Sequence, residues 1–285
     1  MKKKLVLLSP FIVLAMVVFG FQMVFSLPDK PQLSTISSQD NALSLQCFNS
    51  AHTDYIDKDR QLKVLVWNIY KQNRSHWRQE LTQYTQDKQL VLLQEASMSP
   101  ELKGWIQESG WYGNQVNAFK AFKYSAGVLN LSAHTPLKAC AYTELEPWLR
   151  LPKSAIYATY PLSNGQLLAV VNIHAVNFTY GTKEYQNQLG TLVTELTQHT
   201  GPIVIGGDFN SWSEQRLKVM KQVLDALEME EASYEPDNRT QFMTGLPLDH
   251  VFYRGLTLIK AEAPESDASD HNPIEVTFQL TDGDI

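Results

Sequence analysis

The segment GPIVIGGDFNSW, residues 201–212, ends a run of apolar residues with an acid and an amide two positions apart. Residues 203–205 are β-branched, which is typical of a short buried strand. Asp208 and Asn210 follow two glycines, and side chains at positions i and i+2 of an extended segment point the same way. The carboxylate and the amide are therefore predicted to converge on one point, either around a ligand or within a turn.

Five further strand borders carry oxygen or imidazole side chains. They are Asn68 in VLVWN, Glu95 in LVLLQEA, His174 and Asn177 in VVNIHAVNF, Asp249 in LPLDHVFYRG, and Asp270 with His271 in ASDHNPIEV. Each border alone is explained by a cap, a turn or a solvated histidine. Their recurrence at six strand borders indicates one shared site.

The side chains in this set favour phosphoester chemistry. Asn68, Glu95 and Asp270 are hard oxygen donors, which suit Mg²⁺ or Mn²⁺. The sequence contains no HExxH, CxxC, GxSxG or GxxxxGK[ST] pattern, which argues against zinc, α/β-hydrolase and P-loop sites of the usual kinds. Acids, amides and histidines around a divalent cation are typical of a site where a carboxylate activates water against a phosphoryl group.

Short strands separated by turns must position these residues. Alternation and β-branched residues predict strands over 62–67, 90–94, 126–132, 154–160, 167–173, 202–207, 250–255 and 274–280. Helical periodicity occurs near Trp77–Tyr84, Leu189–Leu196 and Leu217–Leu227. Without regular βαβ alternation, internal repeat or second domain boundary, this order predicts an α+β fold with packed sheets.

The N-terminal 27 residues differ from the rest of the chain. Three lysines precede an uncharged apolar run from Leu5 to Leu27, long enough to cross a bilayer with its start in the cytoplasm. We expect an uncleaved inner-membrane anchor carrying a periplasmic domain. The alternatives are a cleaved signal segment with a periplasmic product, and an inefficient segment that leaves the protein cytoplasmic.

Residues 28–61 are polar and rich in Ser, Gln and Asp, which predicts a linker or loosely packed arm. Cys47 and Cys140 are the only cysteines; an oxidising compartment would permit a disulfide, but their spacing leaves the pairing open. The net charge is −6 although residues 1–27 hold three lysines and no acid, so the rest is more acidic still. Such a domain is a poor general binder of polyanions.

The ordered motifs WNIY, LLQEA, NIHAVN, GGDFNSW, LDHVFYRG and SDHNPI resemble the endonuclease/exonuclease/phosphatase superfamily, which has a deoxyribonuclease I-like fold. The resemblance covers roughly residues 62–280 and is closest to a proteobacterial subgroup. It implies a four-layer α/β/β/α sandwich, in which two mixed sheets face each other and the site lies at one end. The superfamily domain is accordingly predicted over residues 62–285.

The resemblance implies a role for each residue that matches a motif. Asn68, Glu95 and Asp270 match the metal side, with Glu95 as the direct ligand of Mg²⁺ and Mn²⁺ as the alternative ion. Asp208 matches the acid that orients or deprotonates the attacking water. Asn210 matches the amide that holds the phosphate.

Two histidines complete the implied machinery. His271 matches the histidine that donates to a phosphoryl oxygen, and Asp249 matches the acid that fixes its tautomer and raises its pKa. His174 matches a histidine of the deoxyribonuclease and sphingomyelinase branches and is expected to contact phosphate or protonate the leaving group. Asn177 is a further expected phosphate contact.

Other features bear on the substrate. Arg150 and Lys153 precede a strand and are candidate phosphate contacts, although surface charge explains them equally well. Abasic-site endonucleases carry an acid where this chain has Tyr70, which argues against a repair endonuclease.

The predicted function is a Mg²⁺-dependent phosphodiesterase or phosphomonoesterase acting on nucleic acid or a phospholipid headgroup. The alternative is a membrane-tethered binding module without activity. No protein partner is predicted.

Overall fold

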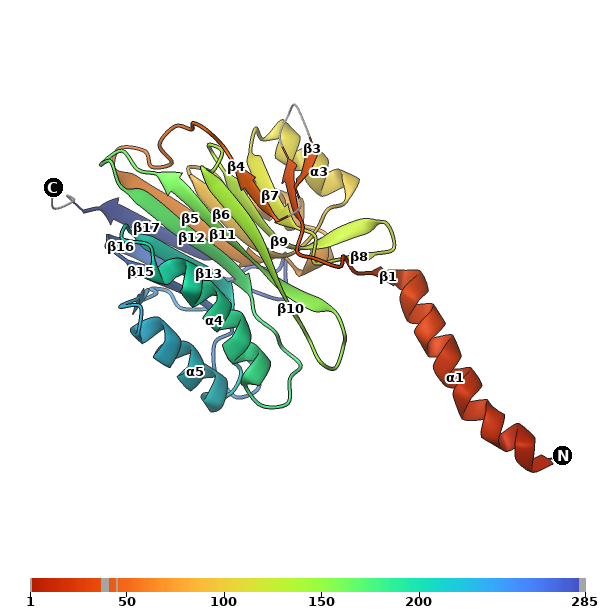
Figure 1. Ribbon diagram of the computed structural model, residues 1–285. Helices are drawn as coiled ribbons and strands as arrows, with labels where there is room; N and C mark the ends of the chain where they lie inside the picture. Colours follow the sequence, from red (N-terminus) through yellow and green to blue (C-terminus); the bar gives the residue numbers. More distant parts are fainter. Residues whose placement is uncertain (1, 37–40, 45, 282–285) are drawn as a thin grey trace.

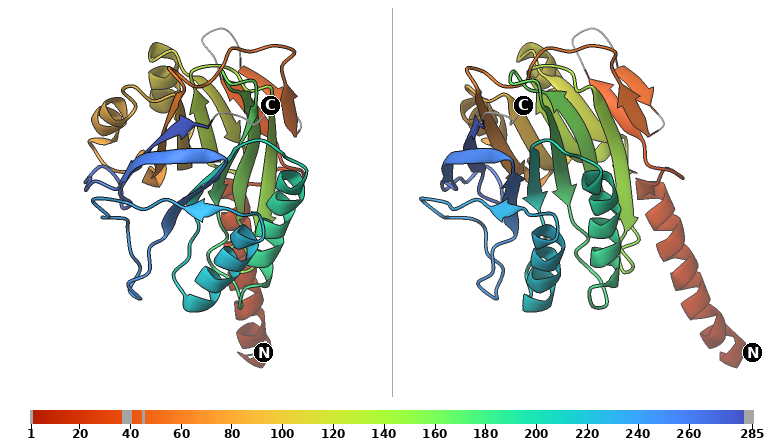
Figure 2. Two further views of the ribbon diagram at one scale, coloured as in Figure 1. Left: turned by 90° about the vertical axis from the view of Figure 1, so that its left-hand side faces the viewer. Right: turned by 60° about the vertical axis from the view of Figure 1, so that its left-hand side comes forward.

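Two β-sheets packed face to face form the body of the molecule, and helices cover their outer faces (Figures 1 and 2). The computed structural model describes residues 2–36, 41–44 and 46–281, and the side chains within them except those of residues 2–10 and 41–44. The four-layer α+β architecture predicted from the sequence is confirmed.

The larger sheet has ten strands within the described residues: β1 (Phe25–Ser26), β2 (Leu33–Ile36), β3 (Asn41–Ser44), β5 (Gln61–Asn68), β6 (Leu90–Ser97), β7 (Tyr112–Val116), β8 (Phe119–Ala121), β9 (Tyr124–Ser132), β16 (Leu256–Glu262) and β17 (Ile274–Leu280). Eight of them lie in the order β16-β17-β5-β6-β9-β7-β2-β3, while β8 pairs with both β9 and β1. The pair β5 and β6 is parallel, so their carboxyl ends meet at one edge of the sheet.

The described residues of the smaller sheet form seven strands: β4 (Cys47–Asn49), β10 (Lys138–Leu145), β11 (Pro152–Pro161), β12 (Leu167–His174), β13 (Ile203–Asp208), β14 (Glu230–Glu231) and β15 (Asp249–Arg254). Their order is β14-β15-β13-β12-β11-β10-β4. Only β12 and β13 run parallel among these neighbours, and again their carboxyl ends meet at one edge. Each sheet therefore delivers two strand ends to the site.

The helical elements are α1 (Lys2–Val24), the 3₁₀ turn η1 (Tyr70–Gln72), α2 (Trp77–Tyr84), α3 (Pro100–Glu108), α4 (Lys183–Thr197) and α5 (Glu214–Asp225). Serine side chains cap α3 and α5: Ser99 Oγ accepts from the Leu102 amide, and Ser213 Oγ accepts from the Arg216 amide. These bonds satisfy N–H groups that the first turn of a helix leaves free.

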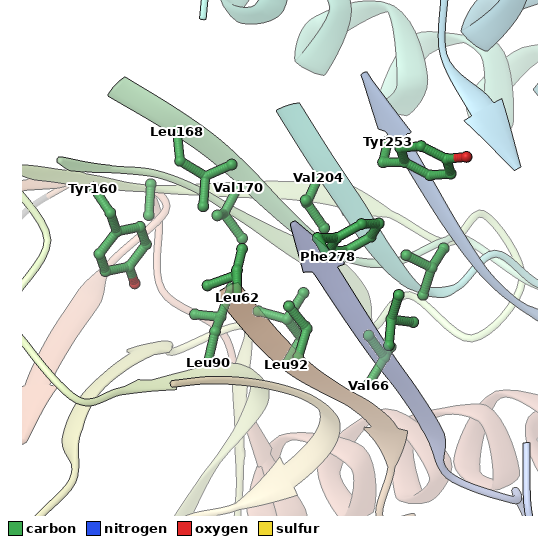
Figure 3. Packing of buried hydrophobic residues seen from close by; sticks show 14 of the residues in the cluster. Leu62, Val66, Leu90, Leu92, Tyr160, Leu168, Val170, Val204, Tyr253 and Phe278 are labelled. Carbon is green, nitrogen blue, oxygen red and sulfur yellow. The ribbon is translucent and has the colours of Figure 1, made fainter. Parts of the chain in front are cut away.

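Three buried clusters separate the four layers. The central cluster lies between the sheets, where Leu62, Val66 and Leu92 of the larger sheet pack near Leu168 and Val204 of the smaller one (Figure 3). A second cluster joins the smaller sheet to α4 and α5, and a third joins the larger sheet to α2 and α3. Strands β6 and β12 are almost continuously apolar, because each of them is buried on both faces.

The segment predicted as a linker, residues 28–61, contributes strands to both sheets, so that prediction is corrected. Leu33 and Ile36 of β2 are buried, and β2 pairs with β7. On the other side, β4 pairs with β10 in the smaller sheet. The polar composition hid this pairing, because β2 buries only two of its four side chains and the edge strand β4 buries none of its three.

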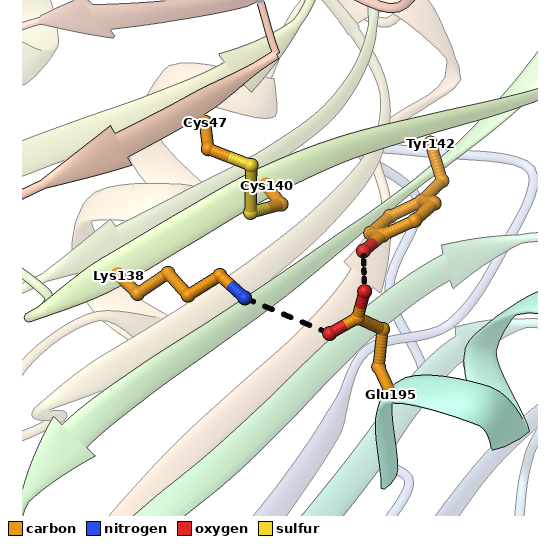
Figure 4. Close-up of a disulfide and its surroundings, with 5 residues drawn as sticks. All are labelled: Cys47, Lys138, Cys140, Tyr142 and Glu195. Carbon is orange, nitrogen blue, oxygen red and sulfur yellow. Dashed lines mark hydrogen bonds and ion pairs between the residues drawn. A yellow bond between two sulfur atoms is a disulfide. The ribbon is translucent and has the colours of Figure 1, made fainter.

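A disulfide joins Cys47 to Cys140, residues whose pairing the sequence leaves open (Figure 4). The two cysteines are direct cross-strand partners in β4 and β10. Beside them, the Tyr142 hydroxyl donates to Glu195 Oε1 over 2.6 Å and Lys138 Nζ lies 3.6 Å from Glu195 Oε2. These contacts tie α4 to the same strand.

Replacing both cysteines by serine is expected to lower the free energy of unfolding by roughly 2–4 kcal/mol, because the bridge closes a loop of 93 residues. Urea unfolding of the double variant, and of the wild type with and without reductant, measures the loss. Identical midpoints for the oxidised and reduced wild type would contradict the expectation.

Helix α1 extends away from the body beside β1 and β8 (Figure 1). Within the part of the chain that the structure describes, no helix is both long and apolar enough to cross a membrane. The side chains of Lys2, Lys3 and Lys4, on which the predicted orientation depends, lie outside the described ones. The anchor or signal segment expected over residues 1–27 stays a prediction.

Candidate active site

Strand register places three of the predicted site residues side by side in the smaller sheet. His174 ends β12 opposite Asp208, which ends β13, and Asp208 in turn lies opposite Asp249, which begins β15. Three polar side chains thus lie in a row across neighbouring strands at one end of the sandwich. Ligand sites in α/β sheets commonly form beyond such carboxyl ends.

Asp208 is buried and lies at the centre of the row. Its Oδ1 accepts from the Asn210 amide over 2.9 Å, and its Oδ2 accepts from Asn68 Nδ2 over 3.0 Å. Burial raises the pKa of Asp208 to about 6, with a further upward contribution from Asp249 that the cations His271 and Lys153 partly oppose. A carboxylate with this pKa is suited to take up a proton near neutral pH.

His271 faces Asp208 from the loop before β17. Its Nδ1 donates to Asp249 Oδ2 over 2.7 Å, and its Nε2 lies 3.9 Å from Asp208 Oδ2. Burial alone would lower the pKa of His271, but the charge and hydrogen bond of Asp249, together with Asp208, raise it to about 10. His271 is therefore a cation at neutral pH, with Nε2 directed to the site.

Contacts with β5 hold the loop that carries His271. Trp67 Nε1 donates to the His271 carbonyl over 2.8 Å, and Ser269 Oγ donates to the Asn68 carbonyl over 2.6 Å. The neighbouring Asp270 is exposed, and its Oδ1 accepts from Ser269 Oγ over 3.4 Å. Asp270 thus lies at the outer border of the site.

Glu95 enters the site through a β-bulge in β6. The pairing register with β9 shifts between Leu93 and Ala96, and Glu95 has φ 53°, in the left-handed region. A bulge re-aims the side chain it carries. Asn172 of the facing sheet stabilises the bulge, since its Nδ2 donates to the Leu93 carbonyl over 3.2 Å.

Two lysines and a histidine surround the Glu95 carboxylate. Lys71 donates to Oε2, while Lys153 Nζ and His174 Nε2 lie 4.0 Å and 3.8 Å from Oε1. Burial would raise the pKa of Glu95, but Lys153 and Lys71 outweigh it and hold the pKa below its usual value. Glu95 is therefore ionised.

His174 is buried between the acids and Lys153. Lys153 Nζ lies 2.7 Å from His174 Nε2, and Asp208 Oδ2 lies 3.4 Å from the same nitrogen. Burial and the nearby Lys153 lower the pKa of His174 well below its usual value. The neutral ring accepts from the lysine through Nε2, so the proton facing the site belongs to Lys153.

Asn210 and Asn177 serve as supports in this structure. Asn210 Nδ2 donates to the Ala175 carbonyl over 2.9 Å, and Asn177 Oδ1 accepts from Trp212 Nε1 over 2.8 Å. Asn177 nevertheless lines a cavity of about 260 Å³ with Glu95, Lys153 and His174. The cavity provides room for a phosphoryl group beside the cations.

Arg150 and His250 lie away from the site. Arg150, a predicted phosphate contact, is exposed and lines a different cavity, beside the end of α1. His250 points away from the site, as adjacent residues of a strand should. Its Nδ1 contacts Glu231 Oε1 at 2.6 Å and its Nε2 contacts Ser211 Oγ at 2.8 Å, all behind the sheet.

Sequence reasoning missed Lys71, Arg216 and Asn172. Lys71 lies in η1, where Tyr70, Lys71 and Gln72 all have positive φ; the only sequence signal is its position three residues after Asn68. Arg216 is buried, and its Nε donates to the Asn210 carbonyl over 2.7 Å. It lies within an ordinary amphipathic helix, so no pattern distinguishes it.

The two glycines before Asp208 allow close approach. Gly206 lets the two sheets approach each other, and Gly207 lets β13 approach β12. A Cβ at Gly207, which has φ 150°, would lie 1.9 Å from the Ile173 carbonyl oxygen, and one at Gly206 would lie 2.8 Å from Val66 Cγ2. Neither position accepts a larger residue without displacement of the site.

Gly207→Ala is expected to lower the free energy of unfolding by at least about 1–3 kcal/mol, because backbone strain is added to a contact with a carbonyl oxygen. Gly190→Ala is the matched control, since nothing lies within 4 Å of its Cβ position in α4 and alanine favours helix. Chemical unfolding of both variants tests the contrast. Equal stability of the two variants would contradict it.

The donor set of the site fits a divalent cation. Among the described residues, Asp208, Asp249 and His271 form the group whose ligand atoms lie within 4.8 Å of one another. The protonated His271 is no ligand, because both of its ring nitrogens carry hydrogen and neither has a free lone pair. The Glu95 carboxylate is ionised, and the ammonium groups of Lys71 and Lys153 balance its negative charge. Glu95 is therefore a position of the site that attracts cations.

The fold is an α/β/β/α sandwich with acids, amides and histidines gathered at one end. The Endonuclease/Exonuclease/phosphatase family matches residues 65–271, and the chain belongs to this family of phosphoric ester hydrolases. A UPF0294 protein of Vibrio parahaemolyticus is 54% identical over 282 residues, covering 99% of this chain and 100% of its own.

Two solved structures share the fold. An endonuclease/exonuclease/phosphatase from Bacteroides vulgatus superposes with a TM-score of 0.62 at 16% identity, covering 78% of this chain and 99% of its own. ANGEL2, a 2′,3′-cyclic phosphatase, superposes with a TM-score of 0.61 at 16% identity, covering 80% and 97%.

Proposed function

We propose that this protein is a divalent-cation-dependent phosphoesterase that hydrolyses a phosphodiester by attack of water on phosphorus. The observation that carries the proposal is the buried pair of Asp208 and His271, 3.9 Å apart, with Asp249 behind the histidine. One member is a carboxylate able to accept a proton, and the other is a cation at neutral pH. Membership of a family of phosphoric ester hydrolases supports the same assignment.

The proton of the attacking water goes to Asp208. Its carboxylate is fixed by Asn68 and the Asn210 amide, so one oxygen lone pair stays aimed at the gap before His271. As the water oxygen bonds to phosphorus, the bond from phosphorus to the leaving oxygen breaks. Lys153, which lies against His174, supplies the proton that the leaving oxygen takes up.

Fixed positive charge stabilises the phosphoryl oxygens. His271 donates through Nε2 while Asp249 maintains its charge, and Lys153 and Lys71 line the cavity beside Glu95. Because His271 is buried and already oriented by Asp249, little reorganisation is needed there as charge develops.

A divalent cation, Mg²⁺ or Mn²⁺, would be held by Glu95, with Asn68 and Asp270 as further oxygen donors. When bound, it would neutralise a phosphoryl oxygen. At Glu95 it would replace the Lys71 ammonium, leaving that lysine for the phosphate.

The proposal is tested with the full chain on bis(p-nitrophenyl) phosphate and p-nitrophenyl phosphate, each with Mg²⁺, with Mn²⁺ and with chelator. Turnover of the diester that the chelator abolishes supports it. Folded protein that binds Mg²⁺ in a titration but turns over neither ester would favour the membrane-tethered binding module instead.

The activity is expected to depend on pH through two groups. Asp208 must be deprotonated and His271 protonated, so kcat/KM should rise through about pH 6, stay level, and fall as pH approaches about 10. Initial rates over this range measure the profile. A profile that is flat from about pH 5 to pH 7 would exclude Asp208 as the base.

Export to the outer side of the inner membrane is part of the proposal. The disulfide between Cys47 and Cys140 supports an oxidising compartment, and the apolar N-terminal run supports attachment to the membrane. Labelling of intact cells with a thiol-reactive probe after reduction, compared with lysed cells, distinguishes this location from the cytoplasm.

A further inference from the structure

Exposed apolar side chains gather beside the site cavity. We name them the aromatic rim: Phe122, Trp148, Leu149, Phe178 and Tyr180. All five are exposed, Tyr180 and Phe122 each by 76%. Leu149 and Phe178 also line the site cavity, and the rings of Trp148 and Tyr180 lie 4.7 Å apart. Exposed apolar groups in one patch mark an interaction surface, whereas scattered ones do not.

The aromatic rim is continuous with the end of α1. A cavity of about 600 Å³ is lined on one side by Val17, Val18 and Phe21, and on the other by Trp148 and Leu149. The Phe122 amide donates to the Val24 carbonyl over 2.7 Å, and β1 pairs with β8 in the hairpin before Phe122. Helix α1 leaves the body at β1 and extends away from it (Figures 1 and 2). A single partner that covers the aromatic rim therefore also covers the end of α1.

The exposure of α1 identifies the kind of occupant. Every residue from Phe11 to Gly20 is exposed, and no charged residue occurs between Leu5 and Leu27. A helix that is apolar on all sides needs an apolar environment on all sides. A groove of a protein partner covers one face of a helix, whereas lipid surrounds it.

The composition of the rim also suits a lipid surface. Trp148 and Tyr180 are the residue types enriched where a bilayer meets water. Lys120, Lys123 and Arg150 are exposed on the same hairpin and loop, although the chain as a whole is acidic. Local basic side chains beside aromatic ones attract anionic headgroups.

We propose that α1 is embedded in a lipid layer on which the aromatic rim rests, and that the site acts on the phosphoester of a lipid headgroup. The second part depends on the proposed function, and the first does not. Phe178 belongs to both the rim and the site cavity, so a headgroup at the surface reaches the cations without leaving the lipid layer.

Fluorescence quenching tests the lipid contact. The full chain is reconstituted in phosphatidylethanolamine and phosphatidylglycerol vesicles with and without brominated acyl chains. Three of the six tryptophans, Trp67, Trp77 and Trp105, are buried, whereas Trp148 is 55% exposed. Bromine should quench the wild type, and Trp148→Phe should lose most of that quenching. Equal quenching of the two proteins would overturn the contact.

The nucleic-acid alternative is an outcome of the same measurement. The rim could instead stack bases, as aromatic side chains do in single-strand binding sites. If a single-stranded oligonucleotide shifts the Trp148 emission and brominated lipid leaves it unchanged, the lipid proposal is overturned.

Activity tests the substrate. The double variant Trp148→Ser, Tyr180→Ser should keep the wild-type turnover of soluble bis(p-nitrophenyl) phosphate and lose at least about tenfold in headgroup release from vesicles. Tyr55→Ser, which alters an exposed tyrosine in the loop before β5, is the control and should change neither. Soluble turnover without headgroup release from the wild type would overturn the substrate class. Absence of both would refute the proposed function, while the quenching result would still decide the lipid contact.

Discussion

Asp208→Asn is expected to lower turnover of a phosphodiester by roughly 10²–10⁴-fold, the range that removal of a general base produces. The carboxylate is the only group at the site that combines a pKa of about 6 with an oxygen facing His271, among the described residues. An amide has no proton affinity near neutral pH. The measurement is kcat and KM at saturating Mg²⁺, and the loss should fall on kcat.

The substitution also costs stability. Both carboxylate oxygens accept hydrogen bonds, from Asn68 Nδ2 and the Asn210 amide, so the NH₂ group of an asparagine must face one donor. The cost should be about 1–3 kcal/mol. Asp225→Asn removes the same charge from an exposed position at the end of α5 and is the matched control. Wild-type kcat in the folded Asp208→Asn protein would remove Asp208 from the mechanism.

His271→Gln is expected to reduce both activity and stability. It removes the cation facing Asp208 and leaves the buried Asp249 charge without its partner, although Asp249 Oδ1 already lacks a hydrogen bond among the described residues. Breaking a buried ion pair costs about 3–5 kcal/mol. Urea unfolding should therefore show a large loss at neutral pH.

The pH dependence of that loss identifies its cause. The folded-state pKa of His271 is about 10, above its ordinary value, so the ion pair stabilises fully below about pH 6.5 and is lost as pH rises toward 10. The stability difference between wild type and His271→Gln should shrink over this interval. His134→Gln, which alters a half-exposed histidine 3.9 Å from Asp54, is the control. A stability difference between wild type and His271→Gln that stays constant with pH would indicate that the substitution removes packing contacts and no ion pair.

Much of the site can be predicted because its residues directly follow or precede apolar strands. Asp208, His174 and Asp249 each occupy a strand border, and the parallel pair β12 and β13 aligns the first two by register alone. The sandwich likewise follows from the order of strands and helices, once the motifs suggest which sheets they form.

The parts that escaped prediction depend on tertiary context. Lys71 reaches Glu95 through a turn of positive φ, which no propensity indicates. Asn172 looks like one polar residue inside a buried strand, yet it donates to the Leu93 carbonyl that precedes the bulge. Arg150 and Lys153 are three residues apart, but only Lys153 lies in β11 and points to the cavity.

In the proposed mechanism, water attacks phosphorus beside Asp208 and His271, and a divalent cation is bound at Glu95. The most direct test is hydrolysis of bis(p-nitrophenyl) phosphate by the full chain in water labelled with heavy oxygen, with Mg²⁺, followed by mass spectrometry of the product. We expect one labelled oxygen on phosphorus per turnover, and no product from Asp208→Asn or with chelator. Unlabelled product, or no turnover by folded protein shown to bind Mg²⁺, would contradict it.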